Sequence, residues 1–280
     1  MLPAGMPAAA MGGVRRVLAA LTDALFPHRC MGCGRLFDHR EREFAADRPL
    51  AGEADFAAVM IPHFCSTCRR QWLPVASPLC SRCGVMFVSR AGGDHLCGQC
   101  LEHGAKGFTR ARAAGVYDQS LRLAIQALKF RGAVQLADPL GRLLFAAFRR
   151  HWPAGDVDVV APVPLHRRRL RERGFNQAWL LLRCWPAVDG SAVVRDLLQR
   201  HRATAPQSGL DRRARRMNIR NAFSMARAGQ SAGKRVLLVD DVLTTGATVN
   251  ACADVLLRDG AARVDVLTVA RVPIAGAFQR

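Results

Sequence analysis

The sequence predicts an α/β fold: a parallel β-sheet flanked by helices, preceded by a cysteine-rich module. Three apolar runs, at Asp156–Val163, Gly233–Val239 and Arg263–Ala270, are nearly continuous rather than alternating, which is typical of parallel strands buried on both faces. Segments with apolar residues at helical spacing separate them. Eight of the ten cysteines form C-x-x-C pairs within the first 100 residues, ahead of these runs.

The length and composition leave room for one large domain and a small one. The chain has 280 residues, of which 50% are hydrophobic, enough for a packed core. We expect an N-terminal amphipathic helix within residues 1–29, centred on Val14–Phe26, then a cysteine module at 30–103 and the α/β domain at 104–280.

The C-x-x-C pairs predict structural zinc sites rather than disulfides. One such pair presents two thiolates to an ion, and two pairs complete a tetrahedral site. This usage is typical of a reducing compartment, so we expect a cytoplasmic protein. No run approaches the roughly 18 uninterrupted apolar residues that a membrane-spanning helix needs.

The cysteine module contains an internal repeat. Cys30–Phe37 and Cys80–Phe87 share both cysteines, a glycine and a closing phenylalanine, which predicts two tandem zinc ribbons holding two Zn2+ ions. The spacing also allows alternate C-x-x-C pairs, rather than consecutive ones, to share a zinc ion. The simplest arrangement places one zinc among Cys30, Cys33, Cys65 and Cys68, and the other among Cys80, Cys83, Cys97 and Cys100.

The first elements of the α/β domain are a strand and two helices. Gly115–Tyr117 has strand character, whereas Ser120–Phe130 and Asp138–Phe148 have helical spacing. The next strand, Asp156–Val163, ends in a proline-rich turn that stiffens the chain.

A basic segment follows that turn. Residues 166–177 contain five arginines, whose guanidinium groups match phosphate oxygens, so the turn and this segment predict an anion site. A solvated basic loop is the alternative. We expect a helix at Asn176–Trp185 and a short strand at Val193 and Val194.

The stretch from Val236 to Thr248 contains the strongest functional pattern. A buried strand runs to Val239, Asp240 and Asp241 follow it, and a hydroxyl- and glycine-rich turn leads into a helix at Ala247–Arg258. A helix N-terminus offers free backbone N–H groups to an anion. The acids suit the hydroxyls of a ribose or a Mg2+ ion held through water, so the stretch predicts a phosphorylated sugar site. Simple helix capping is the alternative.

The charge balance is strongly basic. Lys and Arg number 41 against 22 acids, a net charge of +19, which favours polyanionic partners such as nucleic acid. A general compositional preference for arginine is the alternative. Asp211–Arg220 is predicted as an arginine-rich helix that overhangs the ligand-binding edge of the sheet. Aromatic residues are only 6%, which argues against an extended base-stacking surface.

Six motifs in order along the chain resemble the ComF family. They are L-F-P-x-R-C-x-x-C-G from Leu25, P-V-P-L from Pro162, R-G-F-N-Q from Arg173, R-x-T-x-x-Q-x-x-L from Arg202, N-A-F from Asn221, and V-L-L-V-D-D-V-x-T-T-G-A-T from Val236. The resemblance implies a double zinc ribbon followed by a type I phosphoribosyltransferase-like domain. Such domains bind 5-phosphoribosyl-1-pyrophosphate (PRPP) together with Mg2+.

The resemblance also implies roles for individual residues. Asp240 and Asp241 would be catalytic and would hold the ribose hydroxyls, the turn at 244–248 would hold the 5-phosphate, and the turn at 163–165 the pyrophosphate. For Lys129 and Arg131 we favour solvated cations at a helix end over pyrophosphate contacts. The implied PRPP-binding residues are Asp240, Asp241, Val242, Thr244, Thr245, Gly246, Ala247, Thr248, Val163, Pro164, Leu165 and Arg173.

Two functions agree with these patterns. The first is a phosphoribosyltransferase that transfers the phosphoribosyl group from Mg-PRPP to a nitrogen acceptor such as a nucleobase. The second is a PRPP-binding accessory protein of competence and DNA uptake, which binds single-stranded DNA and other competence proteins without transferase activity. Its possible nucleic-acid contacts are Arg212, Arg213, Arg215 and Arg216. The patterns predict neither the acceptor nor an oligomeric state.

Overall fold

The computed structural model describes residues 28–37, 56–89, 91–102, 104, 107–186, 190–202 and 221–273. Two predicted helices, at Val14–Phe26 and Asp211–Arg220, lie outside these residues.

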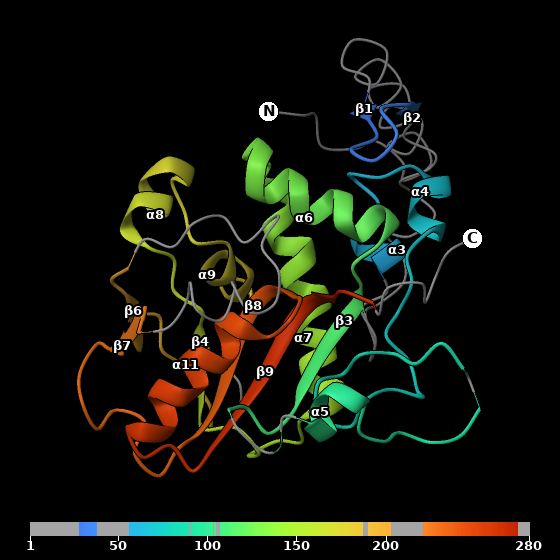
Figure 1. The fold of residues 1–280 in the computed structure, drawn as a ribbon. Coiled ribbons are helices and arrows are strands. Elements are labelled where there is room, and N and C mark those ends of the chain that lie inside the picture. Colours follow the sequence, from blue (N-terminus) through green and yellow to red (C-terminus); the bar gives the residue numbers. More distant parts are fainter. Residues whose placement is uncertain are drawn as a thin grey trace, which may run out of the picture.

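A five-stranded parallel sheet forms the centre of the molecule, as Figure 1 shows. Its strand order is β3-β9-β8-β4-β5, and every neighbouring pair is parallel. The carboxyl ends of the strands therefore meet at one edge. The strands are β3 (Ala111–Val116), β4 (Val159–Pro162), β5 (Ala192–Val193), β8 (Arg235–Leu243) and β9 (Arg263–Arg271).

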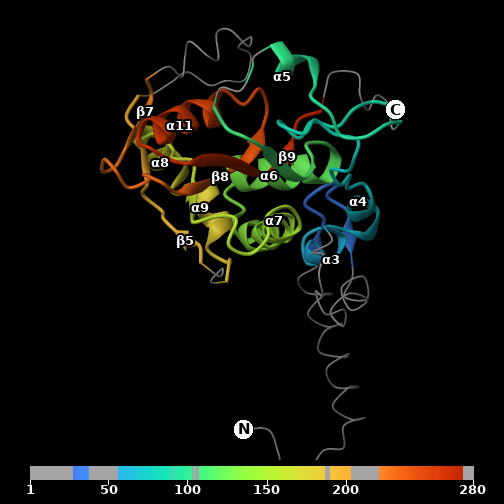
Figure 2. The same cartoon turned by 90° about the horizontal axis from the view of Figure 1, so that it is seen from below.

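Helices cover both faces of this sheet (Figure 2). Strand β8 shows why its sequence is continuously apolar: Leu237 and Val239 belong to one buried cluster, whereas Val236 and Leu238 belong to the other. The first cluster includes α6 (Gln119–Arg131), η1 (Val134–Leu136), α7 (Ala137–His151) and α9 (Gln177–Leu182), and the second includes α11 (Ala247–Arg258).

The predicted extent of β8 was wrong at its end. We expected the strand to stop at Val239, but it continues to Leu243 and pairs Asp240 with Thr268 and Val242 with Ala270 of β9. The two acids therefore stand within the sheet. In the sequence, two acids after an apolar run are typical of a loop. In the structure, β9 extends as far as β8 and supplies the backbone hydrogen bonds that keep these residues in the sheet.

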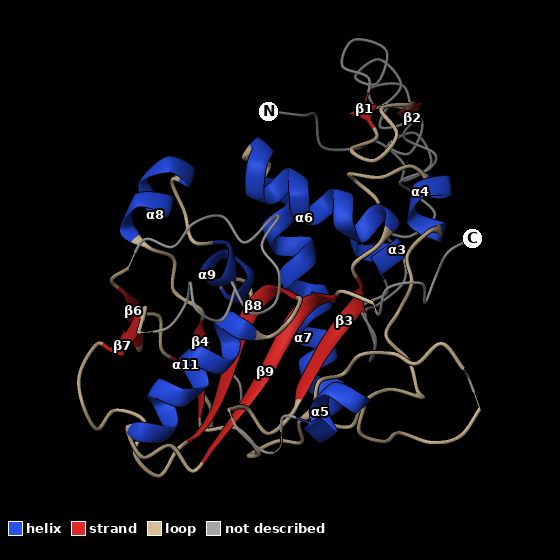
Figure 3. Ribbon diagram, in the orientation of Figure 1, coloured by secondary structure: helices blue, strands red, loops and turns tan. Residues whose placement is uncertain are grey.

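Two further elements differ from expectation or add to it (Figure 3). The basic segment forms a helix, α8 (Arg167–Arg173), which ends at Gly174 with φ +83°. A small antiparallel pair, β6 (Leu198–Arg200) and β7 (Phe223–Met225), lies beside α11. No helix among the described residues is long and apolar enough to cross a membrane.

The cysteine module packs directly on the sheet domain. Its elements are β1 (His28–Arg29), β2 (Leu36–Phe37), α3 (Phe56–Val59), α4 (Ser66–Arg70) and α5 (Gly98–Glu102). Phe56 and Phe64 are fully buried in the same cluster as α6 and α7. The Ser120 hydroxyl at the start of α6 donates to the Cys68 carbonyl.

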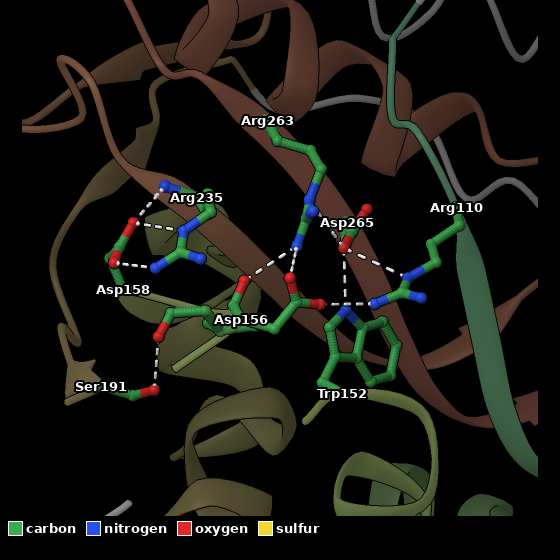
Figure 4. Close-up of polar contacts among 9 residues, drawn as sticks. Arg110, Trp152, Asp156, Asp158, Ser191, Arg235, Arg263 and Asp265 are labelled. Atoms are coloured by element: carbon green, nitrogen blue, oxygen red, sulfur yellow. Dashed lines mark hydrogen bonds and ion pairs between the residues drawn. The ribbon is translucent and has the colours of Figure 1, made fainter. Parts of the chain in front are cut away.

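A polar network closes the amino-terminal edge of the sheet, opposite the strands' carboxyl ends (Figure 4). Asp265 is 1% exposed and accepts a hydrogen bond from Trp152 Nε1 at 2.8 Å. Arg110 and Arg263 each form ion pairs with Asp265 and with Asp156. These charges are shared among several partners, which is the arrangement that buried ionic groups require.

Candidate functional site

A pocket of about 550 Å3 opens at the carboxyl edge of the sheet. It is formed by the turn after β4, helix α8, the ends of α6 and β8, and the beginning of α11. Thr245 does not line it; its Oγ1 accepts a 3.4 Å hydrogen bond from the Ala247 amide. The other predicted PRPP residues all line it: Val163, Pro164, Leu165, Arg173, Asp240, Asp241, Val242, Thr244, Gly246, Ala247 and Thr248.

The loop of residues 244–248 joins β8 to α11 and forms one wall of the pocket. Gly246 is the N-cap of α11 and has φ +78°, a conformation that disfavours any residue with a side chain. The first backbone N–H groups of α11 have no partner within the helix, and its dipole favours negative charge there. The loop is therefore suited to bind a phosphate group.

Asp240 and Asp241 lie on opposite faces of the sheet. Asp241 lies on the same face of the strand as Val239, two residues earlier. It forms an ion pair with Lys129 of α6, with 2.8 Å between Nζ and Oδ2. Asp240 lies on the other face with Leu238, the face covered by α11. Burial and the negative charge of Asp241 raise the pKa of Asp240 to about 7, although Lys129 opposes this rise.

The favoured interpretation of Lys129 as a solvated cation was wrong. Its side chain is only 19% exposed, lines the pocket and is paired with Asp241, because α6 ends beside the carboxyl edge of the sheet. Arg131, at the end of the same helix, is exposed as expected.

Helix α8 brings two of its arginines to the pocket. Arg169 and Arg173 are four residues apart, so both lie on one side of the helix and line the pocket. Arg173 Nη1 donates to Gln177 Oε1 at 2.5 Å, and its guanidinium lies 5.7 Å from the Phe130 ring centroid. Arg168 instead pairs with Glu172 in solvent.

The turn after β4 is held in place from two sides. The Val163 amide donates to the Val239 carbonyl at 2.8 Å, which attaches the turn to β8. Asn176 Nδ2 donates to the Val163 carbonyl at 3.1 Å, while its Oδ1 caps α9 by accepting from the Ala178 amide. Asn176 therefore fixes the turn relative to α9.

Several pocket residues were not predicted from the sequence. Arg169 belongs to the basic segment predicted as an anion site but was not singled out within it; its four-residue spacing to Arg173 would have done so if the segment had been recognised as a helix. Tyr117 and Arg200 come from β3's end and β6, and no local pattern indicates that they meet Asp240.

The eight paired cysteines form two clusters. Within each cluster the four sulfur atoms lie within 4.8 Å of one another, and each group could hold a metal ion. The first cluster contains Cys30, Cys33, Cys65 and Cys68, and the second contains Cys80, Cys83, Cys97 and Cys100. Consecutive knuckles therefore come together, rather than alternate ones.

The hairpins that begin the two clusters have the same hydrogen bonds. The Cys30 amide donates to the Arg35 carbonyl and the Cys80 amide to the Val85 carbonyl, both at 2.8 Å. The amide four residues after each of these cysteines donates back to its carbonyl at 2.9 Å. The sequence repeat is therefore a structural repeat.

Hydrogen bonds favour a thiolate at one cysteine of each cluster, whereas burial and hydrogen bonds among the sulfur atoms raise the pKa of Cys68, Cys83 and Cys100. Hydrogen bonding from the Cys83 thiol, followed by the backbone amides of Cys97 and Cys83, lowers the pKa of Cys80 to about 4 despite burial. Burial would raise the pKa of Cys30, but backbone hydrogen bonds from Cys33, Cys65 and Gly32 outweigh it and lower the pKa to about 7. Four thiolates in this arrangement suit a closed tetrahedral zinc site.

The arginines proposed from the sequence as nucleic-acid contacts are not placed by the structure. Arg212, Arg213, Arg215 and Arg216 lie outside the described residues.

Comparison with known proteins identifies a family model and close relatives. Residues 199–278 match the model described as "Phosphoribosyl transferase domain". The chain is 38% identical over 218 residues to "DNA utilization protein YhgH" of Escherichia coli O157:H7, covering 74% of this chain and 89% of that protein.

Two relatives carry competence names. "Competence protein F" of Haemophilus influenzae is 34% identical over 214 residues, covering 74% of this chain and 90% of that protein. "Competence protein ComFC" of Bacillus subtilis is 25% identical over 213 residues, covering 74% of this chain and 83% of that protein.

Proposed function

Because this chain belongs to the ComF family, we propose that its pocket binds Mg-PRPP and transfers the phosphoribosyl group to a nitrogen acceptor such as a nucleobase. One observation carries the proposal: the two acids of β8 and the phosphate-suited loop at 244–248 share a single pocket with the turn at 163–165 and two arginines. These groups match the ribose, the 5-phosphate and the pyrophosphate of one ligand.

In the proposed reaction a C–N bond forms at the anomeric carbon of PRPP as the C–O bond to pyrophosphate breaks. The nitrogen supplies the electron pair and gives up its proton to solvent, and pyrophosphate leaves with the pair of the broken bond. Arg169 and Arg173 would stabilise the departing pyrophosphate, and the negative charge of the β8 acids would stabilise the positive charge that develops on the ribose. Bound Mg2+ would neutralise part of the pyrophosphate charge.

The protein would act mainly by holding the reactants in place. Asp240 and Asp241 would bind the ribose hydroxyls, and the N–H groups at the start of α11 with Thr244 and Thr248 would anchor the 5-phosphate. The ion pair with Lys129 would keep the Asp241 carboxylate oriented.

Pyrophosphate release tests the transferase. The chain is incubated with Mg-PRPP and a panel of nitrogen acceptors, beside an Asp240→Asn, Asp241→Asn double variant and an Asp254→Asn control, whose carboxylate is exposed on α11. We expect an acceptor-dependent release that the double variant loses and the control keeps. Release no faster than that of the double variant, with every acceptor, would refute transferase activity.

Calorimetry separates binding from transfer. Titration with Mg-PRPP should give saturable binding to the native chain and at least tenfold weaker binding to the double variant, since both proposed ribose contacts are lost. Binding without any transfer would favour the second candidate, a PRPP-binding accessory protein.

That second candidate acts in competence and DNA uptake. It is favoured by the net charge of +19 and by the names of the relatives. In this proposal the chain binds single-stranded DNA through Arg212, Arg213, Arg215 and Arg216, and works with other competence proteins in the cytoplasm.

A charge-matched pair of variants tests the DNA surface. Alanine at these four arginines should weaken single-strand binding in gel-shift assays and reduce the salt dependence by about 3 in log–log slope. The control removes four exposed arginines elsewhere: Arg122, Arg149, Arg183 and Arg258. Equal losses in the two variants would refute a specific surface.

We also propose that each cysteine cluster holds one structural Zn2+ ion. Two complete sets of four sulfur atoms, with amides that stabilise thiolates, support this. Metal analysis of the purified chain should give two zinc ions per chain, and one after a cysteine of either cluster is replaced by serine.

A further inference from the structure

Arg271, the last residue of β9, joins the second cysteine cluster to the loop at 244–248. Its Nη1 donates to the carbonyls of Leu243 at 3.0 Å and Thr244 at 2.7 Å. Its Nε donates to the Cys83 carbonyl at 3.1 Å, and Nη2 lies 3.7 Å from Cys83 Sγ. One planar guanidinium therefore holds the residues that begin the loop and a candidate metal ligand at the same time.

A second route connects the same two regions. Arg82, beside Cys83, donates from Nε to the Phe108 carbonyl at 3.3 Å. The Phe108 ring lies 3.5 Å from the position of a Cβ on Gly246. Both routes start within one residue of Cys83 and end on the loop, so two sets of contacts connect this knuckle to the backbone that we propose binds phosphate.

The knuckle itself has little freedom to move relative to the sheet. The Ala111 amide donates to the Arg82 carbonyl at 2.6 Å. A Cβ on Gly84 would lie 2.5 Å from the Ala111 carbonyl oxygen, so only glycine allows this close approach.

The first cluster contacts a different part of the site. Its Cys68 carbonyl accepts from Ser120 at the start of α6, the helix that carries Lys129. Among the described residues, the guanidinium of Arg271 connects the 244–248 loop to the second cluster and not to the first.

We propose that Arg271 is a positioning residue that couples the second cysteine cluster to the 244–248 loop, so that metal binding at Cys80, Cys83, Cys97 and Cys100 orders the loop for phosphate binding. This inference rests on the proposed PRPP site for its functional consequence, but not for the coupling itself. By linkage, anything that releases the metal loosens the loop, and a ligand in the loop tightens the metal site.

Amide hydrogen exchange of the unliganded full chain tests the coupling without any assumption about PRPP. Arg271→Met should increase exchange at residues 250–252, the first amides of α11 that donate to carbonyls of the loop or the helix, by at least tenfold, whereas Arg271→Lys, which keeps a cationic donor, should increase it less. The matched control is Arg235→Met, which removes a guanidinium that makes two hydrogen bonds at the amino-terminal end of β8. Unchanged exchange in Arg271→Met, or an equal increase in Arg235→Met, would overturn the proposal.

Metal loss at one cluster supplies the second arm. Cys100→Ser should release one zinc and increase exchange at residues 250–252, while Cys33→Ser in the first cluster should release one zinc and leave these amides protected. Combining Cys100→Ser with Arg271→Met should add little to the single variants, because both break the same connection. Equal effects of the two cysteine variants, or full additivity, would refute the coupling.

Calorimetry with Mg-PRPP then shows whether the coupling matters for binding. Arg271→Met should weaken binding about tenfold while the zinc content stays at the native value. If the native chain does not bind Mg-PRPP, the proposed function fails, and the exchange results still decide the coupling.

Discussion

At the scale of single residues, the Lys129–Asp241 ion pair joins the end of α6 to β8 inside the pocket. Asp241 is 3% exposed, and its Oδ2 lies 2.8 Å from Lys129 Nζ, so the two opposite charges are paired in a buried position. The two residues are 112 positions apart in the chain, and the helix-end position of Lys129 by itself suggested a solvated cation.

Replacing Lys129 should reveal this dependence. We expect Lys129→Met to lower the free energy of unfolding by about 3 kcal/mol, since it leaves a buried carboxylate without its partner. Urea unfolding measures the loss. The double variant Lys129→Met, Asp241→Asn should recover most of it, because the uncompensated charge is gone; a double variant as unstable as the single one would contradict this account.

The raised pKa of Asp240 predicts a pH dependence of stability. Its carboxyl loses its proton near pH 3.8 when unfolded but near pH 7 when folded, so the unfolded state binds fewer protons between these values. The contribution of Asp240 to the free energy of unfolding therefore falls as the pH rises from about 4 to 7, and it levels off above pH 7.

Comparison with Asp240→Asn isolates the contribution. The variant should gain free energy of unfolding relative to the native chain by up to about 1.4 kcal/mol per pH unit between pH 5 and 7, and the gain should level off between pH 7 and 8. Urea unfolding at each pH gives the difference. A constant difference across this range would contradict the raised pKa.

At the scale of elements, the turn from β8 into α11 combines two requirements at Gly246. The left-handed φ of +78° and the phosphate-suited N–H groups occur at the same residue. We expect Gly246→Ala to lower the free energy of unfolding by about 1–2 kcal/mol and to weaken Mg-PRPP binding at least tenfold.

A glycine at the other end of the same helix provides the control. Gly260 has φ +90°, and a Cβ there would meet Ala232 at an ordinary 3.5 Å. Gly260→Ala should therefore cost similar stability in urea unfolding while Mg-PRPP binding in calorimetry stays native. Equal loss of binding in both variants would show that helix stability, rather than the loop, controls affinity.

The elements that sequence patterns predicted best are those with the simplest environment. Helix α11 occupies the predicted range Ala247–Arg258 because a glycine turn begins it and one apolar face packs on the sheet. Helix α8 was missed because its seven residues are mostly arginine and have no apolar face to show helical spacing.

At the scale of the whole molecule, the cysteine module and the sheet domain look like two distinct parts in the sequence, but in the structure they share one core. The order of apolar runs predicted the parallel sheet, and the pocket edge followed from it. The contacts between module and sheet could not be predicted, since Phe56 and Phe64 give no local sign that they pack with α6 and α7.

This shared core predicts how the chain responds to chelation. An independent ribbon would unfold alone when its metal is removed. Because residues of the first cluster belong to the main core, we expect chelation to reduce amide protection in α7 as well, in hydrogen-exchange measurements with and without a strong zinc chelator. Loss of protection confined to residues 28–102 would contradict this expectation.

The position of the two acids inside β8 restricts how this chain can vary in length. Successive residues of a strand alternate between faces, so inserting or deleting one residue between Val236 and Asp240 would exchange the faces on which the acids lie. Asp240 would then meet α6 and Asp241 would meet α11. Insertions should therefore accumulate before Arg235, in the turns at 227–234, while the strand keeps a fixed number of residues.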